Sequence, residues 1–199
     1  MMQTSTCIVG LERDGKVYIG GDSAGVTEGF DRSVRVDEKV FISNDMIFGF
    51  TDSFRMGQIL RYVFSPPAQS VGQTDFEYLC GPWTDALIEC LKSKGYATIE
   101  NNNIRGGTFL LGYNGKLYQV YEDFQIGKRV EPYDACGCAF NYAIGVMALL
   151  EDYLDTDMTP EEKITKALEI AERFSAGVSG PFVIECLDED NTEFTFTEE

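Results

Sequence analysis

The chain has 199 residues, which is enough for one globular domain with a sizeable core. Its composition, 44% hydrophobic and 25% charged, is that of a folded protein, and 16 basic against 33 acidic residues give a net charge of −17, which argues against nucleic acid and anionic membrane surfaces as partners. Histidine is absent, and this excludes a Ser-His-Asp triad, a Cys-His dyad and histidine-ligated zinc or haem.

Two strand hairpins are predicted in the first 50 residues. Asp14-Gly15 and Asn44-Asp45 each stand between two β-rich runs, and such residues favour the positive φ angles of a tight turn. The four strands expected around these turns cover residues 6–12, 16–19, 39–42 and 46–50.

Helical periodicity follows the second hairpin. Apolar residues recur at i, i+3, i+4 and i+7 from Met56 to Val63, and Asp52 or Ser53 is available as the N-cap. A second helical stretch includes residues 86–91. The Gly81-Pro82 dipeptide is expected to break or kink the segment before it.

A third hairpin is expected at residues 108–113 and 116–121, around the turn Asn114-Gly115. A helix is then expected over residues 138–153. Its apolar residues lie around much of its circumference, which indicates that it is buried on most sides.

The last predicted helix carries its own start signal. Thr159 is suited to the N-cap, Pro160 to the first helical position, and Glu162 can return a hydrogen bond to the cap. Residues 182–187 and 194–196 are predicted as closing strands. The apolar stripe of this helix comprises Ile164, Ala167, Leu168, Ala171 and Phe174.

This order of elements predicts an α+β fold. Strand hairpins alternate with pairs of helices, which fits two packed antiparallel sheets with helices on their outer faces. Packing of one sheet on the other would explain why the strands are apolar almost throughout. The sequence contains no linker, repeat or low-complexity tract, and we expect a single domain.

The six cysteines and the first residues bear on the compartment. Cys136 and Cys138 form a lone CxC motif and no CxxC pair occurs, so we interpret the cysteines as buried thiols of a reducing compartment. The start of the chain is polar, and the longest apolar run, residues 143–150, is too short to span a membrane. We expect a cytoplasmic protein and predict no cofactor or metal.

Without histidine, amide hydrolysis needs another general base. A threonine hydroxyl can be activated by its own free α-amine, whose ordinary pKa of about 7.7–8.0 leaves a neutral fraction at working pH. The candidate is Thr6, provided that it becomes the first residue of the mature chain. Asp22 ends the return strand of the first hairpin and Lys39 opens the next strand. A nearby lysine would lower the pKa of the amine, and an aspartate would hold that lysine in place.

The chain resembles the proteasome β-subunit family, and especially the bacterial HslV peptidase, of the N-terminal nucleophile hydrolases. The resemblance covers nearly the whole chain and implies a four-layer αββα sandwich, in which two antiparallel sheets are flanked by helix pairs. The matching segments are Thr6-Cys-Ile-Val, the Asp14-Gly15 hairpin, Ile19-Gly-Gly-Asp22, Lys39-Val40, Asn44-Asp45, Gly49-Phe50, Ala135-Cys-Gly-Cys-Ala139 and Ala167-Leu-Glu-Ile-Ala171.

The resemblance implies a threonine endopeptidase that cleaves unfolded polypeptides inside a self-assembled ring, with an ATP-dependent unfoldase as partner. It assigns the roles of nucleophile and base to Thr6 and a supporting ion pair to Lys39 and Asp22. The backbone N–H of Gly49 is the expected oxyanion donor. Cys138 occupies the position of the family's auxiliary serine.

The sequence departs from the family pattern at both ends. Residues 1–5 precede Thr6 and are predicted as a leader or propeptide, so that the domain covers residues 6–199. Self-processing in the family usually cleaves after a glycine, whereas here Ser5 precedes Thr6. Arg173 or Phe174 falls where the family has an aspartate near the end of the last helix.

These departures leave alternatives open. One is a catalytically inactive subunit that acts as a scaffold or ring component. Another is an N-terminal cysteine hydrolase that uses Cys7, or a non-peptide amidohydrolase that uses Cys7 or Thr6. Taken singly, Thr6 is also a common residue at a strand start, Asp22 a common turn residue and Lys39 a common strand-edge charge.

Overall fold

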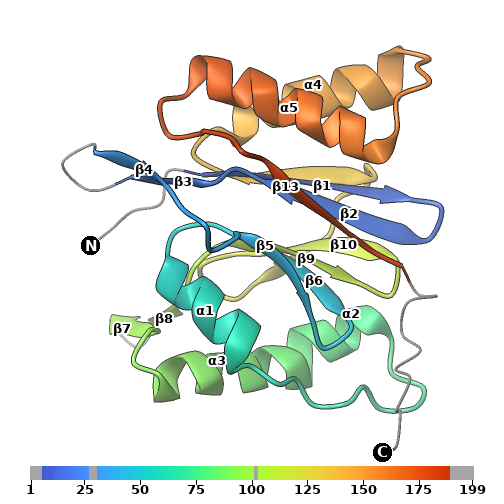
Figure 1. The fold of residues 1–199 in the computed structure, drawn as a ribbon. Coiled ribbons are helices and arrows are strands. Elements are labelled where there is room, and N and C mark those ends of the chain that lie inside the picture. Colours follow the sequence, from blue (N-terminus) through green and yellow to red (C-terminus); the bar gives the residue numbers. More distant parts are fainter. Residues whose placement is uncertain (1–5, 27–30, 101–102, 189–199) are drawn as a thin grey trace, which may run out of the picture.

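Four layers are stacked in the fold: a pair of helices, two β-sheets and a second group of helices (Figure 1). The computed structural model describes residues 6–26, 31–100 and 103–188. The predicted leader at residues 1–5 and the predicted strand at residues 194–196 lie outside the described residues.

The first sheet has four antiparallel strands in the order β12-β1-β2-β13. The predicted first hairpin is confirmed, because Asp14 and Gly15 turn between β1 and β2 with φ angles of 53° and 77°. The strand β12 was not predicted. The bounds are β1 (Cys7–Arg13), β2 (Lys16–Gly21), β12 (Tyr133–Gly137) and β13 (Val183–Leu187).

The second sheet has five antiparallel strands in the order β11-β10-β9-β6-β5. Both predicted hairpins within it are confirmed, and Asn44, Asp45, Asn114 and Gly115 all have positive φ angles in their turns. The bounds are β5 (Val40–Ser43), β6 (Met46–Phe50), β9 (Phe109–Tyr113), β10 (Lys116–Val120) and β11 (Ile126–Gly127).

Two short antiparallel ribbons were not predicted. They are formed by β3 (Ala24–Val26) with β4 (Arg32–Val34) and by β7 (Thr98–Glu100) with β8 (Asn103–Arg105). Each strand has only three residues, so the apolar alternation that marks a strand cannot develop in them.

Helices α1 (Phe54–Tyr62), α2 (Asp75–Tyr78) and α3 (Thr84–Ser93) cover the second sheet (Figure 1). Ser53 caps α1, as predicted, by accepting a hydrogen bond from the N–H of Arg55. A π-helical segment, Leu79–Trp83, joins α2 to α3. The predicted kink at Gly81-Pro82 is confirmed there, since Gly81 leaves the helical region with φ −111° and ψ −105°.

Helices α4 (Phe140–Ala148) and α5 (Pro160–Phe174) cover the first sheet, and a π-helical segment, Leu149–Tyr153, extends α4 (Figure 1). Thr159 and Glu162 form the predicted capping box of α5. The buried side of α5 packs with α4 and with the outward-facing residues of β1 in one apolar cluster. No helix in the described part of the chain is long and apolar enough to cross a membrane.

The prediction that the helix over residues 138–153 is buried on most sides is wrong. Ala143 and Met147 are fully buried, but Tyr142 is 44% and Tyr153 80% exposed. Phe174, expected in the buried stripe of α5, is 59% exposed and stacks on Tyr142 with ring centroids 5.7 Å apart. The helix starts at Phe140 and lies in an outer layer, so only one of its faces meets the sheet.

The cysteines only partly follow the prediction. All six are free thiols. Cys7 and Cys136 are buried as expected, whereas Cys80 and Cys138 are exposed, so burial does not account for those two.

Candidate active site

Thr6 lies immediately before β1, at one end of the first sheet. Cys7 pairs with Gly137 of β12 and Ile8 with Cys136. Since side chains alternate along a strand, Thr6 shares the face of Ile8, which belongs to the apolar cluster between the two sheets. Cys7 points the other way, into the cluster with α5. Thr6 is fully buried.

The structure brings Thr6, Lys39 and Asp22 together. The Lys39 ammonium lies 3.0 Å from Thr6 Oγ1 and 3.0 Å from Asp22 Oδ1. Asp22 directly follows β2, whose last residue, Gly21, is paired with Ile8, and Lys39 directly precedes β5 of the second sheet. The site therefore spans both sheets, and the sheet packing sets its geometry.

Backbone groups fix the Asp22 carboxylate. Its Oδ1 accepts a hydrogen bond from the N–H of Cys7 at 3.0 Å, in addition to the one from Lys39. Its Oδ2 accepts hydrogen bonds from the N–H of Ala24 at 2.9 Å and of Ser179 at 3.4 Å. A buried charge is tolerated when it is paired and hydrogen-bonded, and Asp22 meets both conditions.

Burial sets the electrostatics of the pair. Asp22 and Lys39 are each only 1% exposed. Burial lowers the pKa of Lys39, and Asp22 opposes that shift. Burial also raises the pKa of Asp22, while Lys39 and the N–H of Cys7 oppose that shift. A lysine with a lowered pKa gives up a proton more readily than an exposed lysine.

Gly49 lies inside β6, where a Cβ atom would be 2.5 Å from Ile8 Cγ2 and 2.6 Å from Ile19 Cγ2. Two residues further on, the Thr51 N–H donates to the carbonyl of Thr108 at 3.1 Å. Because N–H directions alternate along a strand, the Gly49 N–H also faces β9, where Leu110 is opposite. To serve as an oxyanion donor, this group would have to leave the sheet ladder.

Cys138 follows β12, one position beyond the Cys7–Gly137 pair, and so lies next to Thr6 in the register of the sheet. Its thiol is exposed and lies 3.8 Å from the hydroxyl of Ser175. Ser175 is the C-cap residue of α5. Sequence reasoning missed Ser175, although it directly follows Arg173 and Phe174. Both of those side chains are exposed, and the Arg173 guanidinium lies over the Phe174 ring.

The alternative nucleophile, Cys7, is poorly placed for catalysis. Its side chain is fully buried and faces the helices rather than Lys39. Burial raises the pKa of its thiol, and the Asp22 carboxylate adds to the shift. Since the thiolate is the reactive form, this environment keeps Cys7 inert.

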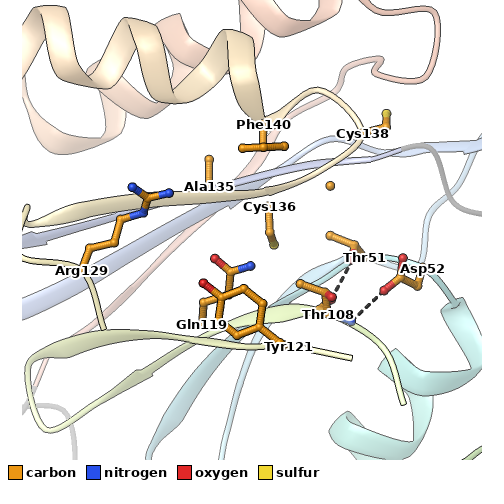
Figure 2. A pocket seen from close by; sticks show the side chains of 11 residues that line it. Thr51, Asp52, Thr108, Gln119, Tyr121, Arg129, Ala135, Cys136, Cys138 and Phe140 are labelled. Atoms are coloured by element: carbon orange, nitrogen blue, oxygen red, sulfur yellow. Dashed lines mark hydrogen bonds between the residues drawn. The ribbon is translucent and has the colours of Figure 1, made fainter. Parts of the chain in front are cut away.

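A cavity of about 620 Å³ opens beside Gly137 and Cys138, between β12 and the second sheet. Figure 2 shows side chains from both sheets around it, with Cys136 and Cys138 on one side and Thr51 and Gln119 on the other. Gly137 connects the cavity to Thr6, because a Cβ atom on Gly137 would lie 2.2 Å from the Thr6 carbonyl oxygen.

The structure is similar to several solved proteins at low sequence identity. BPH from Thiobacillus denitrificans, in its complex with epoxomicin, has a TM-score of 0.76 and 17% identity, covering 92% of this chain and 98% of that chain. HslV from Trypanosoma brucei has a TM-score of 0.65 and 15% identity, covering 92% and 99%. Anbu, an ancestral β-subunit, from Yersinia bercovieri has a TM-score of 0.60 and 12% identity, covering 91% and 81%. No protein-family model matches the chain, and no curated protein matches its sequence.

These similarities establish the fold. The chain has the proteasome-like αββα sandwich, an α+β fold in which two antiparallel sheets lie between helix layers, and the predicted fold class is confirmed. The structural neighbours are those that the suspected resemblance to proteasome-like N-terminal nucleophile hydrolases predicts.

Proposed function

We propose that the chain is a threonine peptidase of the proteasome and HslV type, with Thr6 as its nucleophile. The contact of the Lys39 ammonium with both Thr6 Oγ1 and Asp22 Oδ1, each at 3.0 Å, carries this proposal. A solvated strand-edge lysine or a simple turn aspartate would not be buried with a threonine hydroxyl between two sheets.

In the proposed reaction, residues 1–5 are removed and Thr6 becomes the chain terminus. Its α-amine accepts the proton of Oγ1 as that oxygen attacks the peptide carbonyl carbon, and the adjacent Lys39 charge lowers the pKa of the amine. The C–N bond then breaks, and the leaving nitrogen takes the proton. Water, deprotonated by the same amine, hydrolyses the ester and restores Thr6.

The proposal extends to assembly and location. The nucleophile selects no particular peptide bond, so confinement inside a ring of copies of this chain would restrict its substrates to unfolded polypeptides. An ATP-dependent unfoldase would supply them in the cytoplasm. The similarity of the fold to HslV supports self-association.

The test compares the intact protein with a Thr6→Ala variant. We expect purified protein to have the mass of a chain that starts at Thr6, to hydrolyse unfolded casein, and to gain the mass of one epoxomicin molecule, a compound that a structurally similar protein binds. The Thr6→Ala variant should lose both hydrolysis and labelling. Ser93→Ala removes an exposed hydroxyl on α3 and should change neither.

The competing hypothesis is a catalytically inactive subunit. The fully buried Thr6 side chain and the Cys138–Ser175 contact, with a thiol in place of the family's serine, favour it. It predicts that residues 1–5 stay attached, that epoxomicin adds no mass, and that Thr6→Ala assembles like the parent. Labelled protein with a new terminus at Thr6 would exclude it.

A further inference from the structure

Two cavities lie near the candidate site, and the one on the Phe54 side, next to Lys39, is almost filled. The Phe54 ring is 8% exposed, and its centroid lies 5.7 Å from the Lys39 ammonium. The Arg35 guanidinium covers the same ring at 3.9 Å, and Phe50 meets its edge. The cavity left beside Phe50 and Phe54 is about 20 Å³, so no substrate side chain fits there.

The second space is the 620 Å³ cavity between β12 and the second sheet, and this volume is within the range of small-ligand pockets. It begins at Gly137, directly beside the Thr6 backbone. Thr6 itself is fully buried and is not among the residues that line the cavity, so a peptide bound at Thr6 would reach the cavity past Gly137.

Gln119 places a side-chain amide, which can donate and accept hydrogen bonds, at the cavity. It lies on β10 and is 9% exposed, and Figure 2 shows its amide among the side chains of the cavity. No hydrogen bond joins this amide to another residue of the described chain. The amide atoms are not fully enclosed, so they are open to the cavity and available for a hydrogen bond to a ligand there.

The charges of the cavity favour a cation. The Arg129 guanidinium is already paired with Asp134, at 2.6 Å from Nε to Oδ1. Asp52 Oδ2 accepts a hydrogen bond from the Thr108 N–H at 2.7 Å, which fixes the carboxylate at the cavity. No lysine or arginine of the described residues pairs with Asp52. Of the two charged residues that line the cavity, Asp52 is therefore the one left to pair with a charged ligand.

We propose that this cavity binds a basic side chain, lysine or arginine, of the peptide substrate. Asp52 supplies the charge, and the carbonyl oxygen of the Gln119 amide supplies a further acceptor for an N–H group. Arginine, with five N–H donors, is suited to several acceptors at once. The inference rests on the proposed peptidase function and adds a substrate preference to it.

Binding to the full-length Thr6→Ala variant tests the preference without any turnover. The probes are hexapeptides of alanine that carry one arginine at each position in turn, with norleucine and glutamate series as controls. We expect arginine at one position to bind about tenfold more tightly than norleucine, as one charge-assisted hydrogen bond would allow. Asp52→Asn keeps the side-chain shape and should reduce this ratio to less than twofold, whereas Glu89→Gln, an exposed charge on α3, should leave it unchanged.

Equal binding of the arginine and norleucine series, or a preference that survives Asp52→Asn, would overturn the proposal. The proposed function fails separately, if the parent protein cleaves none of these peptides and no unfolded protein. If cleavage occurs, the ends of the casein products should be enriched in lysine or arginine at one position beside the cut, and Asp52→Asn should remove that enrichment.

Discussion

Replacing Lys39 by methionine should cost far more stability than a surface charge does. Lys39 is 1% exposed and is the cation that faces the equally buried Asp22. Removing one partner of a buried ion pair leaves an uncompensated charge and costs about 3–5 kcal/mol. We therefore expect the free energy of unfolding of Lys39→Met, measured by urea titration at pH 7, to fall by that amount.

The double variant Lys39→Met with Asp22→Asn isolates the cause. It removes the stranded charge, but the single asparagine oxygen can accept the backbone N–H groups of only one of the two former carboxylate oxygens, so part of the lost stability should return. Lys16→Met, at a partly exposed pair with Asp188, is the matched control and should change stability by no more than about 1 kcal/mol. A double variant no more stable than Lys39→Met would refute this account of the site.

The loss of stability in the single variant Lys39→Met should depend on pH. Burial already raises the pKa of Asp22, and losing Lys39 removes a charge that opposes the shift. A group whose pKa is raised on folding contributes stability that is full below its unfolded pKa and is lost as pH rises through the folded pKa. The deficit of Lys39→Met should therefore shrink as pH falls from 8 to 5. A deficit that grows over this range would contradict the assignment.

Three further outcomes follow from the geometry. Iodoacetamide should modify the exposed Cys80 and Cys138 in the native protein, and both buried cysteines only after denaturation, as peptide mass mapping would show. Gly137→Ala should unfold at clearly lower urea than Gly72→Ala, because both glycines have positive φ but only at Gly137 would a Cβ atom meet backbone, at 2.2 Å; equal midpoints would contradict this. Thr159→Ala should lower the unfolding free energy by about 1 kcal/mol through loss of the α5 capping box, whereas an unchanged value would mean that the cap contributes nothing.

Turn chemistry explains why the hairpins could be predicted from the sequence. Asp14-Gly15, Asn44-Asp45 and Asn114-Gly115 demand positive φ angles, and each fixes two strands. The strand β12 lacks such a signal, because its residues Tyr133–Gly137 include an acid and a glycine and no hairpin turn joins it to a neighbour in sequence. The burial of α4 was wrongly predicted because the apolar periodicity of a helix shows which residues are apolar, not whether another element packs against them.

In the candidate site, too, some contacts follow from the local sequence and others do not. The register of the first hairpin places Asp22 beside the start of β1, so that contact follows from local sequence. Lys39 reaches Thr6 from the other sheet, and only the resemblance to a known family indicated this long-range pairing. Ser175 meets Cys138 through the packing of the α5 end against the end of β12, which no local pattern encodes. Gln119 gave no signal either, since a single polar residue in an apolar strand is as common in structural roles as in functional ones.

The buried pair of Lys39 and Asp22 is itself an argument for chemistry at Thr6. Apolar residues of similar size are often as stable as a buried ion pair, or more so, because desolvation offsets the attraction of the charges. Stability alone therefore does not explain a lysine between two otherwise apolar sheets. The Lys39 ammonium donates one of its hydrogen bonds to the Thr6 hydroxyl. That contact places a buried positive charge beside the hydroxyl that acts as the nucleophile in the proposed function.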